Sequence, residues 1–508
     1  MSLLGRIAAL FRGGRSGGRT VHAVHDRPIR ASYDLARTND DNRRHWAVAD
    51  SYDADSANSI AVRRTTVKRS RYETANNGFL QGINRTLANY EVGRGPKLRM
   101  QTANPGMNAT VLAAWNRWTK RVKLARKLRT AVKARAKDGE AFLLAKTNLS
   151  LPDDVKLDLI GLECEQITST DLLFAQKNRI DGITFDEFGN PISYDVLPYH
   201  PGGSWTLGNQ RAEQVPAKFM FHLFQEERPG QHRAIPESAS TLPVSAQSRR
   251  WREATLQAAE NLADFSIFIK TGANPMEGPD QLAPFSSFEI EKGMMTSLPG
   301  GGDAFQPKPE QPAATYEGFL RTQIGELSRP HSMSYSLAAC DSSNANFASA
   351  KLDQHPFHFQ VDTDQADMED LVLDPLFELW FAEAVKRYGW DFADSPAPSH
   401  TWDWPAMPIV NEVDTANARE TNIRTGVSNK PRIVAEDGYD VEEELQKEAE
   451  YYGVTVDEIR AKHFASDFAS SGGTTAESNG AAADEKSQAV PVNRLPARNG
   501  NGRARSTP

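Results

Sequence analysis

An apolar stripe at helical spacing, between Val111 and Ala136, constrains the fold more than any other feature of the sequence. The period predicts one long amphipathic helix with a single buried face. Asp138-Gly139 ends this helix, and strand-like sequence begins at residues 140–144. A chain that changes in this way from helix to strand is expected to be of the α+β class. The stripe consists of Val111, Trp115, Trp118, Val122, Ala125, Val132 and Ala136.

The same helix is strongly basic. Ten basic side chains and no acidic one lie between Arg117 and Lys137. Like charges at this density repel one another unless anions neutralise some of them. Segment 436–458, with ten acidic residues and one basic residue, is one complement, in the same chain or in a neighbour. Nucleic-acid phosphate is the other, but no aromatic side chain on the basic face offers base stacking, so a solvated or protein-paired face is favoured.

Composition excludes several classes of protein. The chain has 508 residues, enough for about two to four domains. Its 59 Lys and Arg against 66 Asp and Glu give a formal net charge of −7, which excludes a generally basic, histone-like binder. Two cysteines, Cys164 and Cys340, form no disulfide framework, so a reducing compartment is expected. No apolar run approaches the roughly 18–20 residues of a membrane span, and the N-terminus is a poor signal peptide.

Helices and a hairpin are predicted in the first half of the chain. Helical sequence from Asn58 stops at the glycines and proline of residues 92–96. Two alternating runs, 183–185 and 192–196, flank turn-forming residues and predict a β-hairpin. A helix of about 27 residues should follow Pro243. Its apolar stripe consists of Trp251, Ala254, Ala258, Leu262, Phe265 and Ile269.

The second half is expected to be mainly helical. A helix over residues 316–327 should end before Pro330, and the Ser-, Ala- and Asn-rich stretch 332–349 is too poor in large apolar groups to be core. A further helix is predicted over residues 364–388. From Ser466 onward the composition predicts disorder. The inward side of helix 364–388 is formed by Met368, Leu371, Val372, Leu376, Leu379 and Trp380.

No motif in the sequence supports catalysis. The chain lacks a phosphate-binding P-loop, the HExxH zinc motif, the GxSxG nucleophile turn and a CxxC pair. The Gly-Arg-Gly sequence before Pro96 lacks an amide donor, so a helix-ending turn is favoured over phosphate binding there. His355 and His358 have no third ligand nearby, and Cys340 is interpreted as a small structural residue. We therefore expect no catalytic residue, no metal site and no cofactor.

Several short motifs follow one another in an order that is specific as a whole. They are Asn76-Asn77-Gly78, Val92-Gly93-Arg94-Gly95, Trp115-x-x-Trp118, Asp138-Gly139-Glu140-Ala141-Phe142, residues 180–191, Arg228-Pro229-Gly230-Gln231 with Arg233 close behind, and residues 344–351. This order resembles the lambda-type portal proteins of tailed bacteriophages and prophages, from about residue 30 to about residue 460. Phe347, Ala348 and Lys351 depart from the usual pattern, as does Arg233-Ala234-Ile235-Pro236.

The resemblance implies a ring of about twelve identical subunits at one vertex of a virion capsid, assembled in the bacterial host cytoplasm. A central channel would pass double-stranded DNA. The terminase large subunit, the major capsid protein and head-completion proteins would be the other partners, and no membrane would be involved. A cyclic ring needs two different surfaces on each subunit, which separate basic and acidic patches provide. Twelve copies at −7 give about −84, a charge that suits sliding DNA.

The resemblance also divides the chain into parts. These are a basic flexible N-terminal arm (1–59), the first part of the wing (60–240), stem helix 1 (241–270), the clip insert (271–315), stem helix 2 (316–330), the tunnel loop (331–350), the long helix and wing return (351–400), a C-terminal crown-like helical region (401–465) and a disordered tail (466–508). Prolines and glycines in the clip insert suit an exposed docking surface.

Two sets of contact residues are expected from this division. No Lys or Arg lies between Pro330 and Lys351, so a mobile tunnel loop would touch DNA without holding its phosphates. The channel candidates are Ser332, Ser334, Tyr335, Ser336, Asp341, Asn344, Asn346 and Lys351. The candidates for stem and subunit contacts are Trp251, Ala254, Ala258 and Leu262, where small side chains let helices approach.

Two other functions stay open at this level. One is a non-portal structural or scaffold protein of the same particle, which would not form closed rings. The other, less favoured, is a nucleic-acid-processing enzyme, for which the sequence offers no catalytic constellation. The ring size comes from the resemblance alone, and no pattern in the sequence identifies the host or the tail type.

Overall fold

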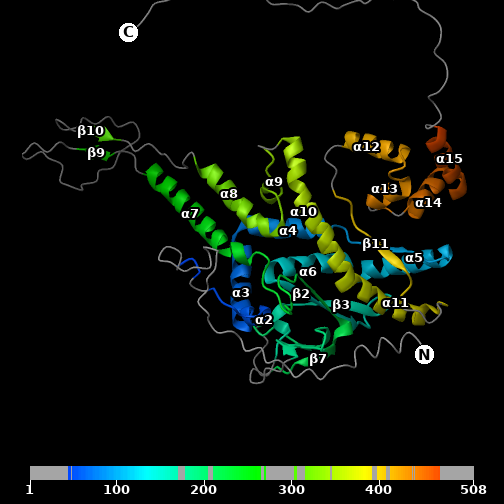
Figure 1. Ribbon diagram of the computed structural model, residues 1–508, viewed down its shortest axis with the longest axis horizontal. Coiled ribbons are helices and arrows are strands. Elements are labelled where there is room, and N and C mark those ends of the chain that lie inside the picture. The colour runs from blue at the N-terminus through cyan, green and yellow to red at the C-terminus, as the bar shows by residue number, and fades with distance from the viewer. Residues whose placement is uncertain are drawn as a thin grey trace, which may run out of the picture. The chain divides into compact units, whose positions relative to one another are not determined.

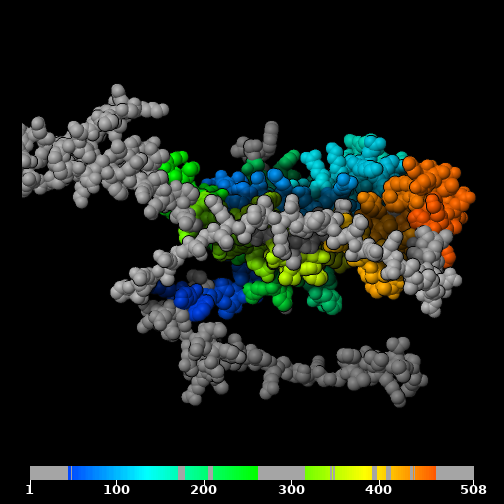
Figure 2. All heavy atoms as spheres, turned by 90° about the horizontal axis from the view of Figure 1, so that it is seen from above, coloured from blue at the N-terminus to red at the C-terminus, as the bar shows by residue number. Residues whose placement is uncertain are grey.

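The computed structural model combines helices with small sheets (Figure 1; Figure 2 draws the same molecule as spheres). The chain divides into two compact units. The first unit comprises Met1–Gly93 and Asn116–Ala397, and the second comprises Arg94–Trp115 and Pro398–Pro508. This mixture of helices and sheets agrees with the predicted α+β class. The residues that the structure describes are 44–46, 49–169, 178–203, 210–264, 268–270, 303–305, 315–343, 346–391, 397–407, 412–437, 439 and 441–469.

A three-stranded antiparallel sheet with the order β3-β2-β8 lies in the first unit. β2 (Glu140–Thr147) is central, between β3 (Leu157–Leu162) and β8 (Met220–Phe224). The register places Phe142 of β2 opposite His222 of β8. The first four residues of β2 are all buried, which explains why this strand has a continuous apolar run instead of an alternating pattern.

A second sheet contains the predicted hairpin. Its strands, in the order in which they pair, are β4 (Arg179–Ile180), β5 (Ile183–Phe185), β6 (Pro191–Val196) and β7 (Glu213–Pro216). The antiparallel pairing of β5 with β6 confirms the hairpin. In its turn the Asp186 carboxylate accepts hydrogen bonds from the amides of Phe188 and Asn190, and Gly189 adopts a φ of 89°.

The helical sequence from residue 58 to residue 92 forms two helices. They are α3 (Ile60–Asn76) and α4 (Gly78–Glu91), preceded by the short α2 (Ala54–Ala57). Asn77 separates them with an extended φ of −118°, and its side chain accepts from the amide of Phe79 to cap α4. Gly93 and Gly95 have φ angles of 50° and 101°, so the helix-ending turn predicted there is confirmed.

The single helix predicted around residues 111–137 is wrong. The chain forms α5 (Pro105–Val122) and α6 (Leu124–Asp138), because Lys123 between them has the left-handed φ of 57°. That residue changes the direction of the helix and shifts its buried side. Leu128 is fully buried, whereas Ala125, which belonged to the predicted stripe, is only half-buried.

The long helix after Pro243 is confirmed but shorter than predicted. α7 (Leu242–Asp264) ends before residues 268–270, which form the strand β9 (Phe268–Lys270) and pair with β10 (Asp303–Phe305). The prediction that Ile269 continues the helical stripe is therefore wrong, since β pairing takes over at that point. Most of the predicted clip insert, like Phe265, lies outside the described residues. α8 (Tyr316–Ser328) ends before Pro330 as expected.

The stretch 332–349 is more ordered than its composition predicts. A 3₁₀ turn, η5 (Arg329–His331), leads into the short helix α9 (Tyr335–Ala339), which packs against α4 and α8. Met333 and Ala338 are buried, with exposed fractions of 4% and 7%, so the prediction that this stretch is too poor in large apolar groups to be core is wrong at these two positions. Small polar residues dominate this stretch, and only a few of its side chains are buried. Composition alone therefore does not reveal the buried positions.

One continuous helical rod follows. It consists of α10 (Phe347–Met368), a π-helical turn η6 (Glu369–Leu373) and α11 (Asp374–Tyr388), and it continues through Pro356. The helix predicted over 364–388 is thus confirmed and begins earlier. The π turn shifts the buried side: Leu371 is 39% exposed, although it was predicted to point inward, and Phe377 is buried.

The second unit holds a two-stranded ladder and several helices. β1 (Lys97–Met100) pairs antiparallel with β11 (His400–Asp403). The helices after this ladder are α12 (Glu412–Arg424), α13 (Lys430–Glu436), α14 (Val441–Tyr452) and α15 (Val456–Ala469). The prediction of disorder from residue 466 is therefore wrong for its first residues, because α15 extends to Ala469. Across the described ranges no helix has both the length and the apolar character of a membrane span.

Candidate functional site

Two buried arginines bring the sequence motifs together. The first is Arg233, whose guanidinium donates to Glu140 Oε1 at 2.6 Å and lies 3.1 Å from Asp181 Oδ2. It also donates to the carbonyl oxygens of Cys164 and Ile167, at 3.1 Å each. Glu140 begins the central strand β2, so Arg233 joins that strand to the segment before the second sheet and to the turn between β4 and β5.

Two further side chains complete what we call the Glu140 cluster: Arg63, Glu140, Asp181, His222 and Arg233. Arg63 pairs with Asp181, and His222 Nε2 lies 3.1 Å from Glu140 Oε2. Although burial opposes it, the charge of Arg233 and the contact with His222 hold the pKa of Glu140 below its usual range. Burial lowers the pKa of His222, so its ring is neutral and two guanidinium groups face two carboxylates.

The Arg-Pro-Gly-Gln motif forms the turn that positions Arg233. Gln231 Oε1 accepts from the amides of Glu227 and Arg228, and its Nε2 donates to the carbonyl of Arg233 at 3.0 Å. Gly230 has a φ of 78°, which a residue with a side chain rarely adopts. The resemblance identified this motif, but its link to a buried arginine emerges only from the fold.

The second buried arginine is Arg135, near the end of α6. Its two terminal nitrogens donate to Glu91 at 3.2 and 3.0 Å, and one of them also donates to Asp364 at 2.7 Å. Its Nε donates to Glu237 Oε1 at 2.7 Å, and Glu237 Oε2 lies 3.0 Å from Nδ1 of the buried His331. These five residues, the Arg135 cluster, connect α6 to α4, to the segment before α7, to η5 and to α10.

The Arg135 cluster has more carboxylates than cations. Burial raises the pKa of Glu91 to about 8, and it also raises the pKa of Asp364. Glu237 behaves differently: despite its burial, Arg135 and His331 hold its pKa at about 2. Glu91 therefore carries a proton at neutral pH, while Glu237 is ionised and paired.

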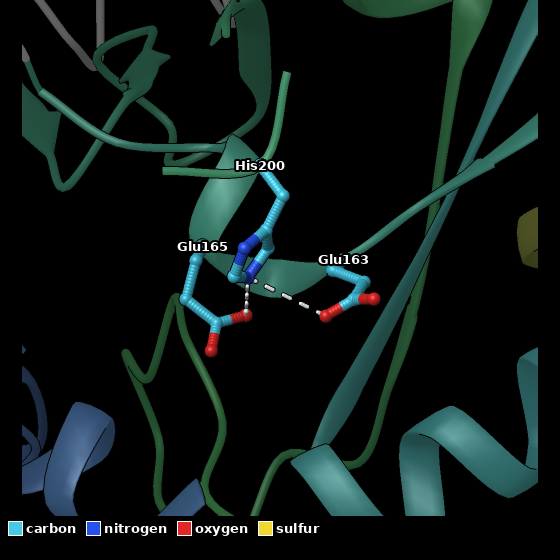
Figure 3. Close-up of side chains that lie close together, drawn as sticks. All are labelled: Glu163, Glu165 and His200. Carbon is cyan, nitrogen blue, oxygen red and sulfur yellow. Dashed lines mark ion pairs between the residues drawn. The ribbon is translucent and has the colours of Figure 1, made fainter. Parts of the chain in front are cut away.

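A third group lies on the surface beside the Glu140 cluster (Figure 3). His200 Nε2 lies 3.4 Å from Glu163 Oε2 and 3.5 Å from Glu165 Oε2, a donor set that could in principle hold a cation. Arg71 already binds both carboxylates, at 3.1 and 2.8 Å, and it also pairs with Asp138 at 2.8 Å. Both carboxylates of the group are thus already paired with a guanidinium, which lowers their attraction for a cation. Sequence patterns missed it because the histidine and the glutamates come from separate loops.

The basic side chains of α6 divide into two kinds. Arg135 is buried, Lys127 pairs with Asp158, and Arg129 donates to a backbone carbonyl. By contrast, Arg126 and Lys133 are exposed, and no ion pair joins them to any part of the chain that the structure describes. The exposed cations and the paired Lys127 line what we call the basic groove, a hollow of about 560 Å³ between α6 and the strands β2 and β3. Its basic residues are Lys123, Arg126, Lys127, Lys133 and Lys137.

Several channel candidates gather at α9. Tyr335 Oη donates to Asp341 Oδ2 at 3.4 Å, and the guanidinium of Arg321 lies 4.6 Å from the Tyr335 ring. The hydroxyl groups of Ser334 and Ser336 lie 3.1 Å apart. The remaining candidates are placed elsewhere: Ser332 has a left-handed φ of 51°, Asn346 caps α10, Lys351 is exposed on α10, and Asn344 lies outside the described residues.

The stem candidates lie on α7, which packs beside α8 (Figure 1). The ring of Trp251 stacks on Tyr316 at 4.8 Å and meets the edge of Phe319 at 4.8 Å. Ala254 is exposed and Ala258 is half-buried, while the side chain of the fourth candidate, Leu262, lies outside the description. Aromatic stacking, more than small residues, therefore joins the two helices.

Residues 40–365, more than half of the chain, match the family model described as phage portal protein, lambda family. No curated protein sequence matches. Among solved structures, a chain in the neck of an empty GTA particle computed with C6 symmetry has a TM-score of 0.44 and 14% identity, over 73% of this chain and 93% of that chain. A chain from the virion of a native gene transfer agent particle has a TM-score of 0.41 and 16% identity, over 73% and 92%. A chain in the neck of a native GTA particle computed with C12 symmetry has a TM-score of 0.41 and 15% identity, over 74% and 94%.

Gly139 allows the close approach on which the Glu140 cluster depends. Its φ is +92°, and a Cβ atom there would lie 2.3 Å from the backbone carbon of Ile235. Gly139→Ala should lower the free energy of unfolding by more than about 2 kcal/mol, measured by chemical denaturation. Gly189→Ala is the matched control, with a φ of +89° and no atom within 4 Å, and should cost only about 1–2 kcal/mol. Equal costs would contradict the close-approach argument.

Glu91 should make stability depend on pH. Its pKa rises from 4.5 to about 8 on folding, so its contribution is complete below about pH 4.5 and is lost as the pH rises through 8. A glutamine does not ionise. The melting temperature of Glu91→Gln should therefore exceed that of the parent by an amount that grows between pH 5 and pH 8, as followed by thermal unfolding.

Glu237 offers a control of opposite sign within the same cluster. Its pKa is held at about 2, so its contribution is present above about pH 4.5 and is lost as the pH falls through 2. Glu237→Gln should be less stable than the parent at neutral pH, with a deficit that shrinks on acidification. If both glutamine variants follow the same pH trend, the assignment of the proton to Glu91 is wrong.

Proposed function

Because the chain belongs to the lambda family of phage portal proteins, we propose that about twelve copies form a closed ring at one vertex of a phage-like capsid. The ring encloses a channel that passes double-stranded DNA during packaging and ejection. Portal proteins of this kind are structural, so the ATP-driven step belongs to a separate motor. The family match over residues 40–365 is the single observation that carries this proposal.

We propose that the α9 region lines the channel. Between His331 and Ala350 the chain has no Lys or Arg, so contact with DNA adds little phosphate affinity and does not stall the duplex. Buried side chains of His331 and Met333 anchor the segment to the core. Cys340, at the end of α9, is exposed. In place of the fully mobile loop of the sequence prediction, the segment contains a short helix, α9, that follows the buried residues His331 and Met333.

The other parts of the ring are assigned by analogy with the family. α7 and α8 form the stem, and the insert 271–315 forms the clip on which the terminase large subunit and head-completion proteins dock. The helices after β11 form the crown-like region, and residues 60–240 with the rod after residue 351 form the wing, which faces the major capsid protein. The ring is assembled in the host cytoplasm and remains at the virion vertex.

Negative-stain microscopy of the purified full-length protein tests the ring directly. We expect closed rings with a central opening and about twelve subunits, together with no reproducible nuclease or ATPase activity. Monomers under all assembly conditions, or open filaments, would contradict the proposal. A nuclease or ATPase activity that co-purifies with the chain and is lost on point substitution would favour the enzyme class.

The two cysteines report the position of α9. Cys340 is exposed, whereas Cys164 is buried and burial raises its pKa. A thiol reagent at pH 8 should therefore modify one cysteine per folded subunit, and mass spectrometry should identify it as Cys340. Filling the rings with DNA should slow this reaction. Equal reaction rates in empty and DNA-filled rings would place α9 away from the channel.

A further inference from the structure

The rod formed by α10, η6 and α11 exposes an acidic and apolar side. Nine acidic residues and no Lys or Arg lie between residues 352 and 385. Asp362 and Asp370 are exposed, and neither forms an ion pair within the described ranges. The same stretch exposes two large apolar side chains, Leu352 at 69% and Phe359 at 70%. Leu352, Phe359 and Asp370 recur at seven and eleven residues, which places them on one side of the helix.

The opposite kind of surface is the basic groove. Arg126, Lys133 and Lys137 recur at seven and four residues and so share one side of α6. The facing wall is mainly apolar and open: Leu162 of β3 is half-buried, and a Cβ atom on Gly161 would meet nothing within 4 Å. Its acidic residues are already paired, Glu163 with Arg71 and Glu140 with Arg233. The groove thus offers exposed cations along one wall and a mainly apolar strip along the other.

The chemistry of the groove favours a protein helix over DNA. Phosphate groups would satisfy the cations, but an apolar wall gains nothing from a sugar-phosphate backbone. An acidic helix with exposed Leu and Phe side chains can pair with the cations of one wall and pack against the apolar residues of the other. The axial spacing also agrees: Asp362 and Asp370 are about 12 Å apart along the rod from α10 into η6, and Arg126 and Lys133 are about 10 Å apart along α6.

The acidic segment 436–458, the complement suggested by the sequence, is less suited to this role. In α14 the carboxylate of Glu442 pairs with Arg460 at 2.5 Å, and Glu444 pairs with Lys447 at 2.9 Å. These carboxylates already have cationic partners in their own unit. Asp362 and Asp370 have none, so a cationic surface that approaches them gains more electrostatic energy than one that approaches α14.

We propose that the exposed side of α10 and η6 in one copy of the chain binds the basic groove of the next copy. The inference rests on the proposed ring, for which it supplies the two different surfaces that a cyclic assembly needs. Asp362 lies two residues from Asp364, which points the other way and binds Arg135. The Arg135 cluster therefore fixes the inner side of α10 directly opposite the proposed contact.

Charge reversal on each side tests the contact. Arg126→Glu with Lys133→Glu places anions opposite anions, and Asp362→Lys with Asp370→Lys places cations opposite cations. Each double variant alone should lower the fraction of subunits in rings by at least about tenfold, measured by sedimentation velocity and negative stain. Arg85→Glu with Lys386→Glu, two exposed cations on α4 and α11, gives the same change in charge as the groove variant and should assemble like the parent.

Mixing the two double variants in equal amounts gives the decisive result. In an alternating ring every groove then meets an opposite charge, so rings should return. A single chain that carries all four substitutions is the comparison. If this quadruple variant forms rings and the mixture does not, the contact lies within one chain and the proposal is overturned. Normal assembly of both double variants, or no rescue of either kind, would also overturn it. If the parent forms no rings, it is the proposed function that fails.

Discussion

The guanidinium of Arg135 is the interaction on which the arrangement of the first unit depends. It binds Glu91 at the end of α4, Glu237 before α7 and Asp364 in α10; Glu91 and Asp364 are buried, and the side chain of Glu237 is 11% exposed. Removing one partner of a buried ion pair typically costs about 3–5 kcal/mol, because the other charge stays buried without compensation. One side chain therefore joins α6 to α4, to the segment before α7 and to α10, whose outer side we propose as a subunit contact.

The two buried clusters differ in their charge balance. In the Glu140 cluster two guanidinium groups face two carboxylates, with Arg233 joining the sheet to the turn of the Arg-Pro-Gly-Gln motif. In the Arg135 cluster one guanidinium serves three carboxylates, and Glu91 holds a proton. The Glu140 cluster therefore stabilises the sheet with equal numbers of positive and negative charges. The Arg135 cluster, which joins the helix ends, depends on the protonation of Glu91.

Much of the helical framework was predictable, and the ionic clusters were not. Apolar periodicity and helix-breaking residues located α7, α8 and α11, although the stripe predicted on α7 includes an exposed Ala254 and a half-buried Ala258. The breaks at Lys123 and at the π turn leave no mark in that period, since packing from distant segments imposes them. Arg135 looks like any other cation of a basic helix, and its partners Glu91 and Asp364 lie 44 and 229 residues away. The family resemblance found the motif before Arg233, but not the carboxylate that this arginine binds.

The Arg135 cluster joins the end of α4 to η5, and so supports α9, which follows η5 directly. Hydrogen–deuterium exchange on assembled rings of the parent and of Arg135→Lys tests this claim most directly, since lysine keeps the charge but loses the fork that reaches several carboxylates. Faster exchange is expected in α4, η5 and α9, with α12–α15 unchanged. Exchange that rises only within α6, while α9 keeps its protection, would contradict the claim.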